Sequence, residues 1–242
     1  MSAVWLIVMR EVRSYASTWS GYLVGASLLL LSGLLYNVYG IGDVPQYSRD
    51  VLRNAFYFLS GTTLVAGILF AMRLIAEERQ TGSIKLLLSA PISDSQLVLA
   101  KFLAGFVPLL AYVAASMYIP LLVFFRGEVA FGHVAAGALG LVLLGSAGVS
   151  IGLFGSCLFK SQLVAAMVSG VIAVVMILLW QTSKIVDGPL GEAISALALH
   201  DRHFFPFMEG TISTANVVYY LSVTLFFLAL SRNVMEASRW RV

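Results

Sequence analysis

The sequence predicts an all-α integral membrane protein: six transmembrane helices, an N-terminal interfacial elbow helix, and a short external re-entrant hairpin between the fifth and sixth helices. Two observations lead to this fold class. Hydrophobic residues make up 60% of the 242 residues and charged residues only 11%, with a mean hydropathy of +0.91, which leaves too few polar side chains to cover a soluble domain. The apolar residues also gather in runs of roughly 17–25 residues, the length that spans a bilayer. We therefore expect residues 1–242 to form a single membrane domain.

The apolar runs give the boundaries of the expected spans. They cover residues 20–39, 55–76, 102–125, 134–157, 162–180 and 215–231. Residues 1–19 precede the first span, and there apolar residues alternate with Arg10 and Arg13 at roughly helical spacing. Such a segment suits an amphipathic helix in the membrane interface, with Trp5 at the depth of the lipid headgroups. Residues 77–101 and 181–214 form the two longest connections.

Lysine and arginine are distributed unequally between the two sides of the membrane. An even number of spans places both termini on one side, and that side carries ten of the fifteen Lys and Arg residues. Because loops rich in these residues stay in the cytoplasm, we expect cytoplasmic termini and a multi-pass protein of the inner (cytoplasmic) membrane. The basic residues are spread over many loops, so the pI of about 9.1 does not indicate nucleic-acid binding.

The stretch EERQTGSIKLLLSAPISDSQLVLAK, residues 77–101, should then be a cytoplasmic loop. Gly82 permits a sharp turn, residues 84–88 predict a short apolar helix, Pro91 ends it, and Ser93 caps the next helix. An uncovered leucine ridge at 86–88 would cost about 1.5–3 kcal/mol per side chain. Two interpretations stay open: the ridge rests on lipid or on the protein's own bundle, or a cytoplasmic protein receives it in a groove.

Residues 181–214 form the longest external connection. Gly188, Pro189, Pro206 and Gly210 break any spanning helix within it. Two short pieces, near residues 190–199 and 204–209, are expected to dip into the outer leaflet without crossing it. Irregular backbone at that depth has to lie against protein or a wet cavity.

The sequence offers no evident side chains for catalysis or for a metal centre. We place His133, His200 and His203 in external loops, where a metal held by the last two with Asp201 is less expected than ordinary hydrogen bonding. The one cysteine, Cys157, lies in an apolar run and is expected to be a packing residue. Because the chain lacks a Gly-rich phosphate loop, we do not expect an enzyme. Because the spans lack charges, we do not expect an ion-coupled carrier. We also expect no cofactor or metal on this chain. The energy for any transport would come from a partner.

The loop at 77–101 carries a motif of Gly, Leu-Leu, Pro and Lys at fixed spacing, with matching residues Glu78, Gly82, Ser83, Leu87, Leu88, Pro91, Ser93 and Lys101. It resembles the segment between the second and third membrane helices in permeases of the second ABC exporter type. In that family the segment is the coupling helix, which docks on a separate ATP-hydrolysing subunit. The resemblance implies a docking surface formed by Glu77, Glu78, Arg79, Gly82, Ser83, Leu86, Leu87, Pro91, Ser93 and Lys101 in the loop, and by Trp5, Arg10 and Arg13 in the elbow helix.

The segment HDRHFFPFMEGTISTANVVYY, residues 200–220, carries a second resemblance. It is similar to the same region of permeases associated with gliding motility and with nitrous-oxide-reductase maturation, a subgroup of this family. The match rests on His203, Phe204, Phe207 and Gly210 in the external hairpin, followed by Ile212, Asn216, Val217, Tyr219 and Tyr220.

The resemblance implies the permease subunit of an ATP-driven ABC transporter. Two permease chains, identical or similar, would bind two copies of an ATP-binding subunit that carries ATP and Mg, and the two six-helix bundles would tilt to export or extract a substrate. Further membrane or periplasmic partners are compatible with this assembly. In family members the second and fifth spans line the path, here with Phe56, Thr62, Thr63, Met167 and Met176, although these residues also suit ordinary packing. The alternative is a membrane partner of an ATPase that transmits mechanical or regulatory signals and moves no cargo.

Overall fold

A computed structural model describes residues 3–40, 47–89, 92–126, 129–186 and 188–239, and within these ranges every regular element is helical. Six helical segments are long and apolar enough to cross a membrane: Gly21–Tyr39, Ser48–Thr81, Asp94–Phe125, Phe131–Leu158, Gln162–Ser183 and Thr214–Arg239. The predicted fold class, an all-α membrane protein with six spans, is confirmed.

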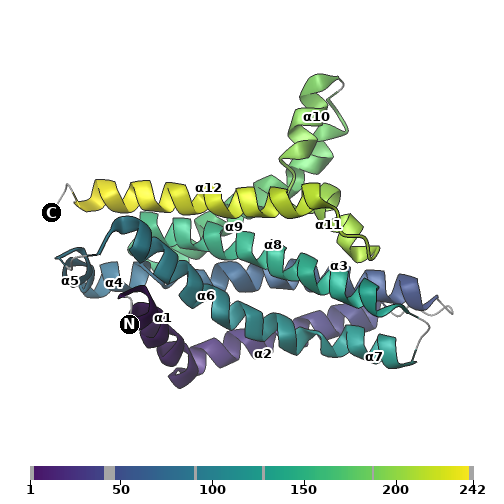
Figure 1. Cartoon of the computed structure of the whole chain (residues 1–242), viewed down its shortest axis with the longest axis horizontal. Helices are drawn as coiled ribbons and strands as arrows, with labels where there is room; N and C mark the ends of the chain where they lie inside the picture. Colours follow the sequence, from purple (N-terminus) through teal and green to yellow (C-terminus); the bar gives the residue numbers. More distant parts are fainter. Residues whose placement is uncertain (1–2, 41–46, 90–91, 127–128, 187, 240–242) are drawn as a thin grey trace.

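The helices pack lengthwise into one bundle (Figure 1). In chain order they are α1 (Ala3–Ser17), α2 (Trp19–Leu35), the π-helical turn η1 (Tyr36–Gly40), α3 (Ser48–Ala71), α4 (Ala76–Thr81), α5 (Ile84–Ser89), α6 (Asp94–Ser116), α7 (Tyr118–Arg126), α8 (Phe131–Leu158), α9 (Gln162–Ser183), α10 (Pro189–Ala196), α11 (Asp201–Met208) and α12 (Thr214–Arg239). Several helices run past the apolar spans. The last two turns of α12, for example, carry an exposed ion pair between Arg232 and Glu236, 3.9 Å apart.

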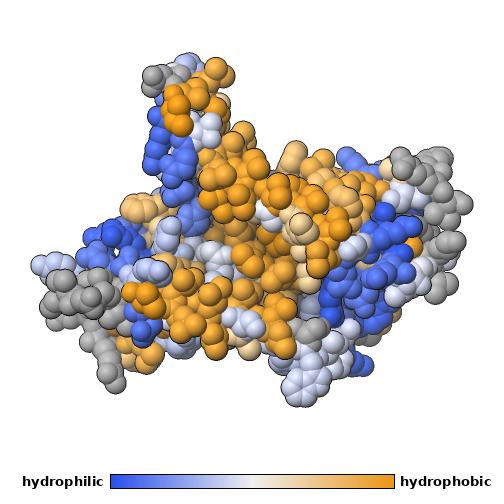
Figure 2. Space-filling view, turned by 180° about the vertical axis from the view of Figure 1, so that it is seen from behind, coloured by the Kyte–Doolittle hydropathy of each residue, from blue (hydrophilic) through white to orange (hydrophobic). Residues whose placement is uncertain are grey.

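The two ends of the bundle differ in what they hold. One end, which we call the proximal end, carries α1, α4, α5 and the last turns of α12; the opposite, distal end carries α7 and α11 (Figure 1). Hydrophobic side chains cover the middle of the face shown in Figure 2, and hydrophilic ones gather toward both ends. This distribution is the one that a bilayer requires of a protein that crosses it.

Helix α8 forms the centre of the bundle, and its glycines let α3 approach it closely. A Cβ atom on Gly148 would lie 2.9 Å from the carbonyl oxygen of Leu64, and one on Gly152 would lie 2.8 Å from that of Ile68. A Cβ atom on Gly67 of α3 would lie 2.8 Å from the carbonyl oxygen of Gly145. The two backbones are therefore in direct contact, as is common where small residues mediate helix packing in membranes.

The distal connection between α9 and α12 forms two short helices, α10 and α11, close to the two pieces expected from the sequence. Helix α10 projects away from the bundle (Figure 1). Helix α11 lies against α8, with Phe204 and Phe207 completely buried, because Gly140 leaves room for them. The backbone N–H of Leu199 donates to the carbonyl of Met176 at 3.0 Å, which fixes the connection to α9.

The histidines do not all lie in loops as expected: only His200 does, between α10 and α11. His133 lies in the first turn of α8 and His203 in α11, and all three histidines are buried. Each is hydrogen-bonded: Nε2 of His133 is 2.6 Å from the Met208 carbonyl oxygen, Nε2 of His200 is 2.6 Å from Ser60 Oγ, and His203 contacts Asn216 and the Ala196 carbonyl. Burial lowers the pKa of His200, with the nearby Asp201 partly opposing it. The histidines thus fasten the distal hairpin to the bundle.

The close contact between α3 and α8 predicts a difference between two glycines of α3. Gly67→Val should lower the free energy of unfolding by about 3 kcal/mol or more, because the added carbons meet backbone atoms that cannot rotate away. Gly61→Val changes the same residue on the same helix, but a Cβ there has nothing within 4 Å. Thermal melting of the two purified variants in detergent checks this. Equal melting temperatures would contradict the packing described.

Candidate functional site

The candidate site is the proximal end, where the second span breaks. Helix α3 ends at Ala71 and α4 begins at Ala76, and the backbone N–H groups of Ile75 and Ala76 both donate to Ser156 Oγ, at 2.9 and 2.8 Å. Ser156 belongs to the last turns of α8. A helix start leaves N–H groups without partners, and this hydroxyl accepts from two of them. The start of α4 is therefore anchored to the central helix.

The turn after α4 requires a glycine for its backbone conformation. Gly82 ends α4 with φ +79° and ψ −2°, the left-handed region that other residues rarely adopt. Helix α5 follows, and α6 then begins with a capping box in which Ser93 Oγ accepts from the N–H of Gln96 while the Gln96 side chain accepts from the N–H of Ser93, both at 3.3 Å. The predicted turn at Gly82 and cap at Ser93 are confirmed.

A network of four charges joins α1, α4 and α6, with Lys101 fully buried and Arg10 at its exposed edge. Lys101 of α6 is 0% exposed, and its Nζ lies 2.7 Å from Glu78 Oε1 and 3.0 Å from Glu11 Oε1. Arg10 of α1 contacts the same two oxygen atoms, at 2.9 and 2.7 Å. Two carboxylates are thus shared between two cations. A buried ammonium is tolerated only with such partners, so α1 and α4 must both stay in place around Lys101.

The network shifts the pKa values of two of its members, Glu11 and Arg10. Burial by itself would raise the pKa of Glu11, but the charge of Lys101 and the hydrogen bonds from Arg10 and Lys101 outweigh it, and the pKa of this carboxyl is lowered. The hydrogen bond with Glu11 raises the pKa of Arg10 in turn. Both shifts favour the charged forms of Glu11 and Arg10.

The end of α12 is tied to the same region. Nη2 of Arg79 in α4 donates to Ser238 Oγ at 2.8 Å. Arg239 forms an ion pair with Asp94 at the start of α6, at 2.8 Å, and donates to the Ile92 carbonyl at 3.2 Å. Helix α4 is therefore linked by polar contacts to α1, α6, α8 and α12.

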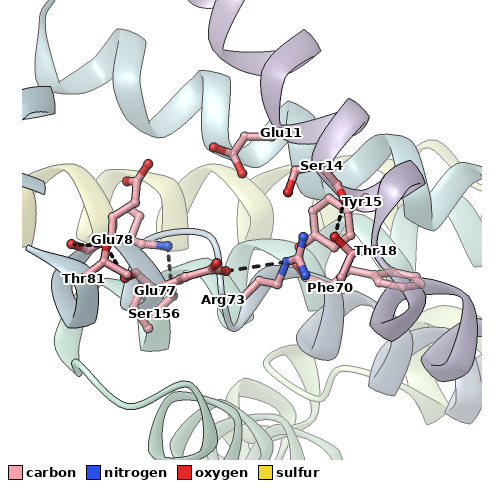
Figure 3. Close-up of polar contacts among 12 residues, drawn as sticks. Glu11, Ser14, Tyr15, Thr18, Phe70, Arg73, Glu77, Glu78, Thr81 and Ser156 are labelled. Carbon is pink, nitrogen blue, oxygen red and sulfur yellow. Dashed lines mark hydrogen bonds and ion pairs between the residues drawn. The ribbon is translucent and has the colours of Figure 1, made fainter. Parts of the chain in front are cut away.

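A second contact between α1 and the break lies beside this network (Figure 3). The guanidinium of Arg73 lies 3.9 Å from the centre of the Tyr15 ring, and its Nε is 4.0 Å from Glu77 Oε2. The Tyr15 hydroxyl donates to the carbonyl of Phe70, and burial raises the pKa of that hydroxyl, which keeps its proton. Cation–π contact and hydrogen bond together hold α1 over the end of α3.

Comparison with known proteins assigns the family. The family model described as ABC-2 family transporter protein matches residues 38–187, more than half of the chain and including α3, α4, α6, α8 and α9. The chain belongs to the ABC-2 transporter family. No curated protein matches it significantly in sequence. The six apolar helices and the family together make this ABC-2 protein a multi-pass membrane permease component of an ABC transporter.

The residues predicted for docking in this ABC-2 chain fall into two groups. The exposed group includes Arg13, Glu77, Gly82 and Ser93, and Trp5 is half exposed. The side chain of Leu86 and all of Pro91 lie outside the described residues, and Leu87 is half buried against the core. A surface for a partner on α4 thus remains at its exposed side.

Lys101 and Glu78 belong to the other group, whose side chains face the inside of the bundle rather than its surface. Lys101 is fully buried and the Glu78 side chain is 12% exposed, because each needs the opposite charge more than water in this position. Arg79 is likewise directed at α12. Through these contacts, Lys101, Glu78 and Arg79 fix the position of α4, whose outer side remains exposed.

The predicted path residues of the second span are also placed differently. Phe56, Thr62 and Thr63 are buried inside the single bundle, where the glycines of α8 draw α3 inward. Their burial accords with the packing interpretation and leaves none of the three at the outer surface of this bundle. On α9, Met167 is 63% exposed, whereas Met176 is partly buried against the core.

Sequence reasoning missed three residues that build the site: Glu11, Ser156 and Arg239. Glu11 had a visible signal, since a lone acid on the elbow helix and a lysine immediately before the predicted third span are natural partners. Ser156 and Arg239 had none, because small hydroxyls and terminal arginines are common at the ends of membrane helices.

The charge network predicts a large and specific effect at Lys101. Lys101→Met should lower the free energy of unfolding by about 3–5 kcal/mol, because two carboxylates stay buried with only Arg10 to pair them. Adding Glu11→Gln and Glu78→Gln should recover part of this loss. Lys160→Met, at an exposed lysine, is the control. Melting curves that do not separate Lys101→Met from Lys160→Met would refute the role given to the network.

Proposed function

We propose that this ABC-2 protein is the permease subunit of an ATP-driven exporter, and that the proximal end is where a separate ABC ATP-binding subunit docks. The observation that carries the proposal is the position of α4: it is partly exposed and yet bonded to α1, α6, α8 and α12. A force applied to its exposed side would be passed to the whole bundle rather than to one loop.

The energy source in this proposal is outside the chain. ATP and Mg would be held by the partner, and its closure on ATP would move α4 and α5. Because Glu78 of α4 shares its carboxylate with Lys101 of α6 and Arg10 of α1, these three helices would move as one body. The permease itself would perform no hydrolysis.

Two permease chains, identical or similar, with two ATP-binding subunits complete the proposed assembly. The resemblance of residues 200–220 to the gliding-motility and nitrous-oxide-reductase-maturation permeases supports this type of exporter. The substrate would cross between the two bundles, where the exposed face of α9 with Met167 is the available surface in place of the buried residues of α3. The proximal end would face the cytoplasm and the chain would lie in the inner membrane.

Docking at α4 predicts different effects for two exposed threonines. Thr81 ends α4 and Thr211 lies in the distal turn, and each donates its hydroxyl to a nearby carbonyl, of Glu77 and Pro206, both at 2.9 Å. Thr81→Trp should weaken binding of the ATP-binding subunit by about tenfold or more, because a bulky side chain then stands in the centre of the interface. Thr211→Trp is the matched control.

Co-purification of the ATP-binding subunit with each variant, and Mg-ATP hydrolysis by the complex, measure this effect. Binding that is unchanged by Thr81→Trp, or lost equally in Thr211→Trp, would exclude docking at α4. ATP-dependent uptake into inverted vesicles then distinguishes an exporter from a signalling partner, which would support ATP turnover without moving cargo.

The proposed orientation predicts the labelling of cysteines at the same two positions. In inverted membrane vesicles a membrane-impermeant maleimide should label Thr81→Cys and leave Thr211→Cys unlabelled, and in intact cells with a permeabilised outer layer the reverse should hold. The native Cys157 is completely buried and contributes little background. Labelling of Thr81→Cys from outside the cell would reverse the topology and with it the proposal.

A further inference from the structure

A groove runs along the proximal half of the bundle between α2 and α6. It has a volume of about 550 Å³, within the range of ligand sites. Gly21, Gly25 and Ala26 of α2 form one wall, Pro108, Ala111 and Ala115 of α6 form the other, and Tyr15, Phe70 and Tyr112 are also part of the lining. The groove exists because the facing side chains are too small to meet; at Gly25 even an added Cβ would have nothing within 4 Å.

Helix α1 forms a further side of the groove and is held in place by polar contacts. Val12, Tyr15 and Ala16 of α1 line the groove, and Tyr15 is fixed by its hydrogen bond to Phe70 and its contact with Arg73. The Tyr22 hydroxyl donates to the Ala16 carbonyl at 2.9 Å, which ties the start of α2 to α1. Because the last turns of α1 are bonded both to the end of α3 and to the start of α2, the groove does not close by a simple shift of this part of α1.

The mouth of the groove has the character of a lipid headgroup site. A second hollow of about 390 Å³ shares Ala16 and Tyr22 with the groove and adds Ser17 and Trp19, and Trp19 is 88% exposed. Arg13 precedes Ala16 and Ser17 by three and four positions, so it lies on the same face of α1. Arg13 is exposed and forms no ion pair with another described residue. Tryptophan and arginine at the end of a span are typical contacts for the interface and for a phosphate.

We propose that this groove binds a phospholipid, with one acyl chain between α2 and α6 and the phosphate beside Arg13 and Trp19. The walls belong to helices that cross the membrane, and only 11% of the α2 span is buried, so the groove opens on the side of α2 that meets lipid. In a bilayer an unfilled apolar groove loses its dispersion contacts, and an acyl chain is the surrounding molecule of the right shape to restore them. The negative charge of an anionic phospholipid would also pair with the guanidinium of Arg13, which forms no ion pair with another described residue.

Photolabelling of the chain alone in vesicles tests the proposal without any ATP-binding subunit, so its outcome is independent of the function proposed above. The vesicles contain phosphatidylethanolamine and phosphatidylglycerol with a trace of phosphatidylglycerol that carries a diazirine halfway along one acyl chain. Mass spectrometry of the digested protein should find the label concentrated on α2 between residues 21 and 29 and on α6 between residues 107 and 115, above the level on the exposed face of α9.

Two variants separate a site from general lipid contact. Gly25→Leu places a side chain in the groove at a position where an added Cβ has nothing within 4 Å, and should reduce the α2 and α6 label to the α9 level with the melting temperature retained. Gly61→Leu, equally free of contacts, should keep the label. Arg13→Gln should reduce the preference for phosphatidylglycerol over an equivalent phosphatidylethanolamine probe by roughly fivefold.

Three results would overturn the proposal. The first is wild-type label spread evenly over α2, α6 and α9. The second is label on α2 and α6 that Gly25→Leu leaves unchanged. The third is efficient disulfide formation between copies of a Gly25→Cys variant, which would assign the groove to a second copy of this chain.

Discussion

The ammonium group of Lys101 has no access to water, and the proximal end of the bundle is organised around that constraint. A buried charge of this kind is tolerated only when opposite charges reach it. Glu78 and Glu11 do so from two other helices, and Arg10 balances the second carboxylate. The break in the second span, the elbow helix and the start of the third span therefore cannot be positioned independently. Their relative geometry is set by one set of ion pairs.

The glycines of α8 provide the second constraint, along the membrane-spanning part. Hydrophobic burial does not drive helices together inside lipid, so close backbone contact has to supply the attraction. Gly148 and Gly152 allow α3 to come within contact of the α8 backbone. The same close packing brings the end of α3 near Ser156 of α8. The Ser156 hydroxyl accepts hydrogen bonds from the backbone N–H groups at the start of α4. The packing of the spans and the shape of the proximal surface are thus consequences of one contact.

The two faces of α1 have different roles in this arrangement. Arg10 and Glu11 join the buried charges, whereas Val12, Tyr15 and Ala16 line the apolar groove. In the proposed assembly, α1 would therefore couple a protein partner on one side to the proposed lipid on the other. In an ABC-2 permease this gives the membrane a physical route by which it acts on the same element that the proposed ATP-binding subunit would move.

Local sequence determined much of this molecule. The six spans, the turn at Gly82, the cap at Ser93 and the two short helices of the distal hairpin follow from apolar run length, glycine conformation and capping chemistry, all of which act between near neighbours in the chain. The residues of these features could be named without any knowledge of how the helices pack.

Which polar side chains lie at the surface and which pair with each other depends on how the helices pack, and the sequence did not reveal it. Glu78 and Lys101 looked like docking residues in the sequence, yet they face inward because they pair with each other and with two charges of α1: Arg10, 68 positions from Glu78, and Glu11, 90 positions from Lys101. Phe56 and Thr63 looked like path residues, yet the glycines of α8 turn them inward. Hydropathy and spacing describe one helix at a time, whereas the burial of a charge or a ring depends on the helix that lies opposite.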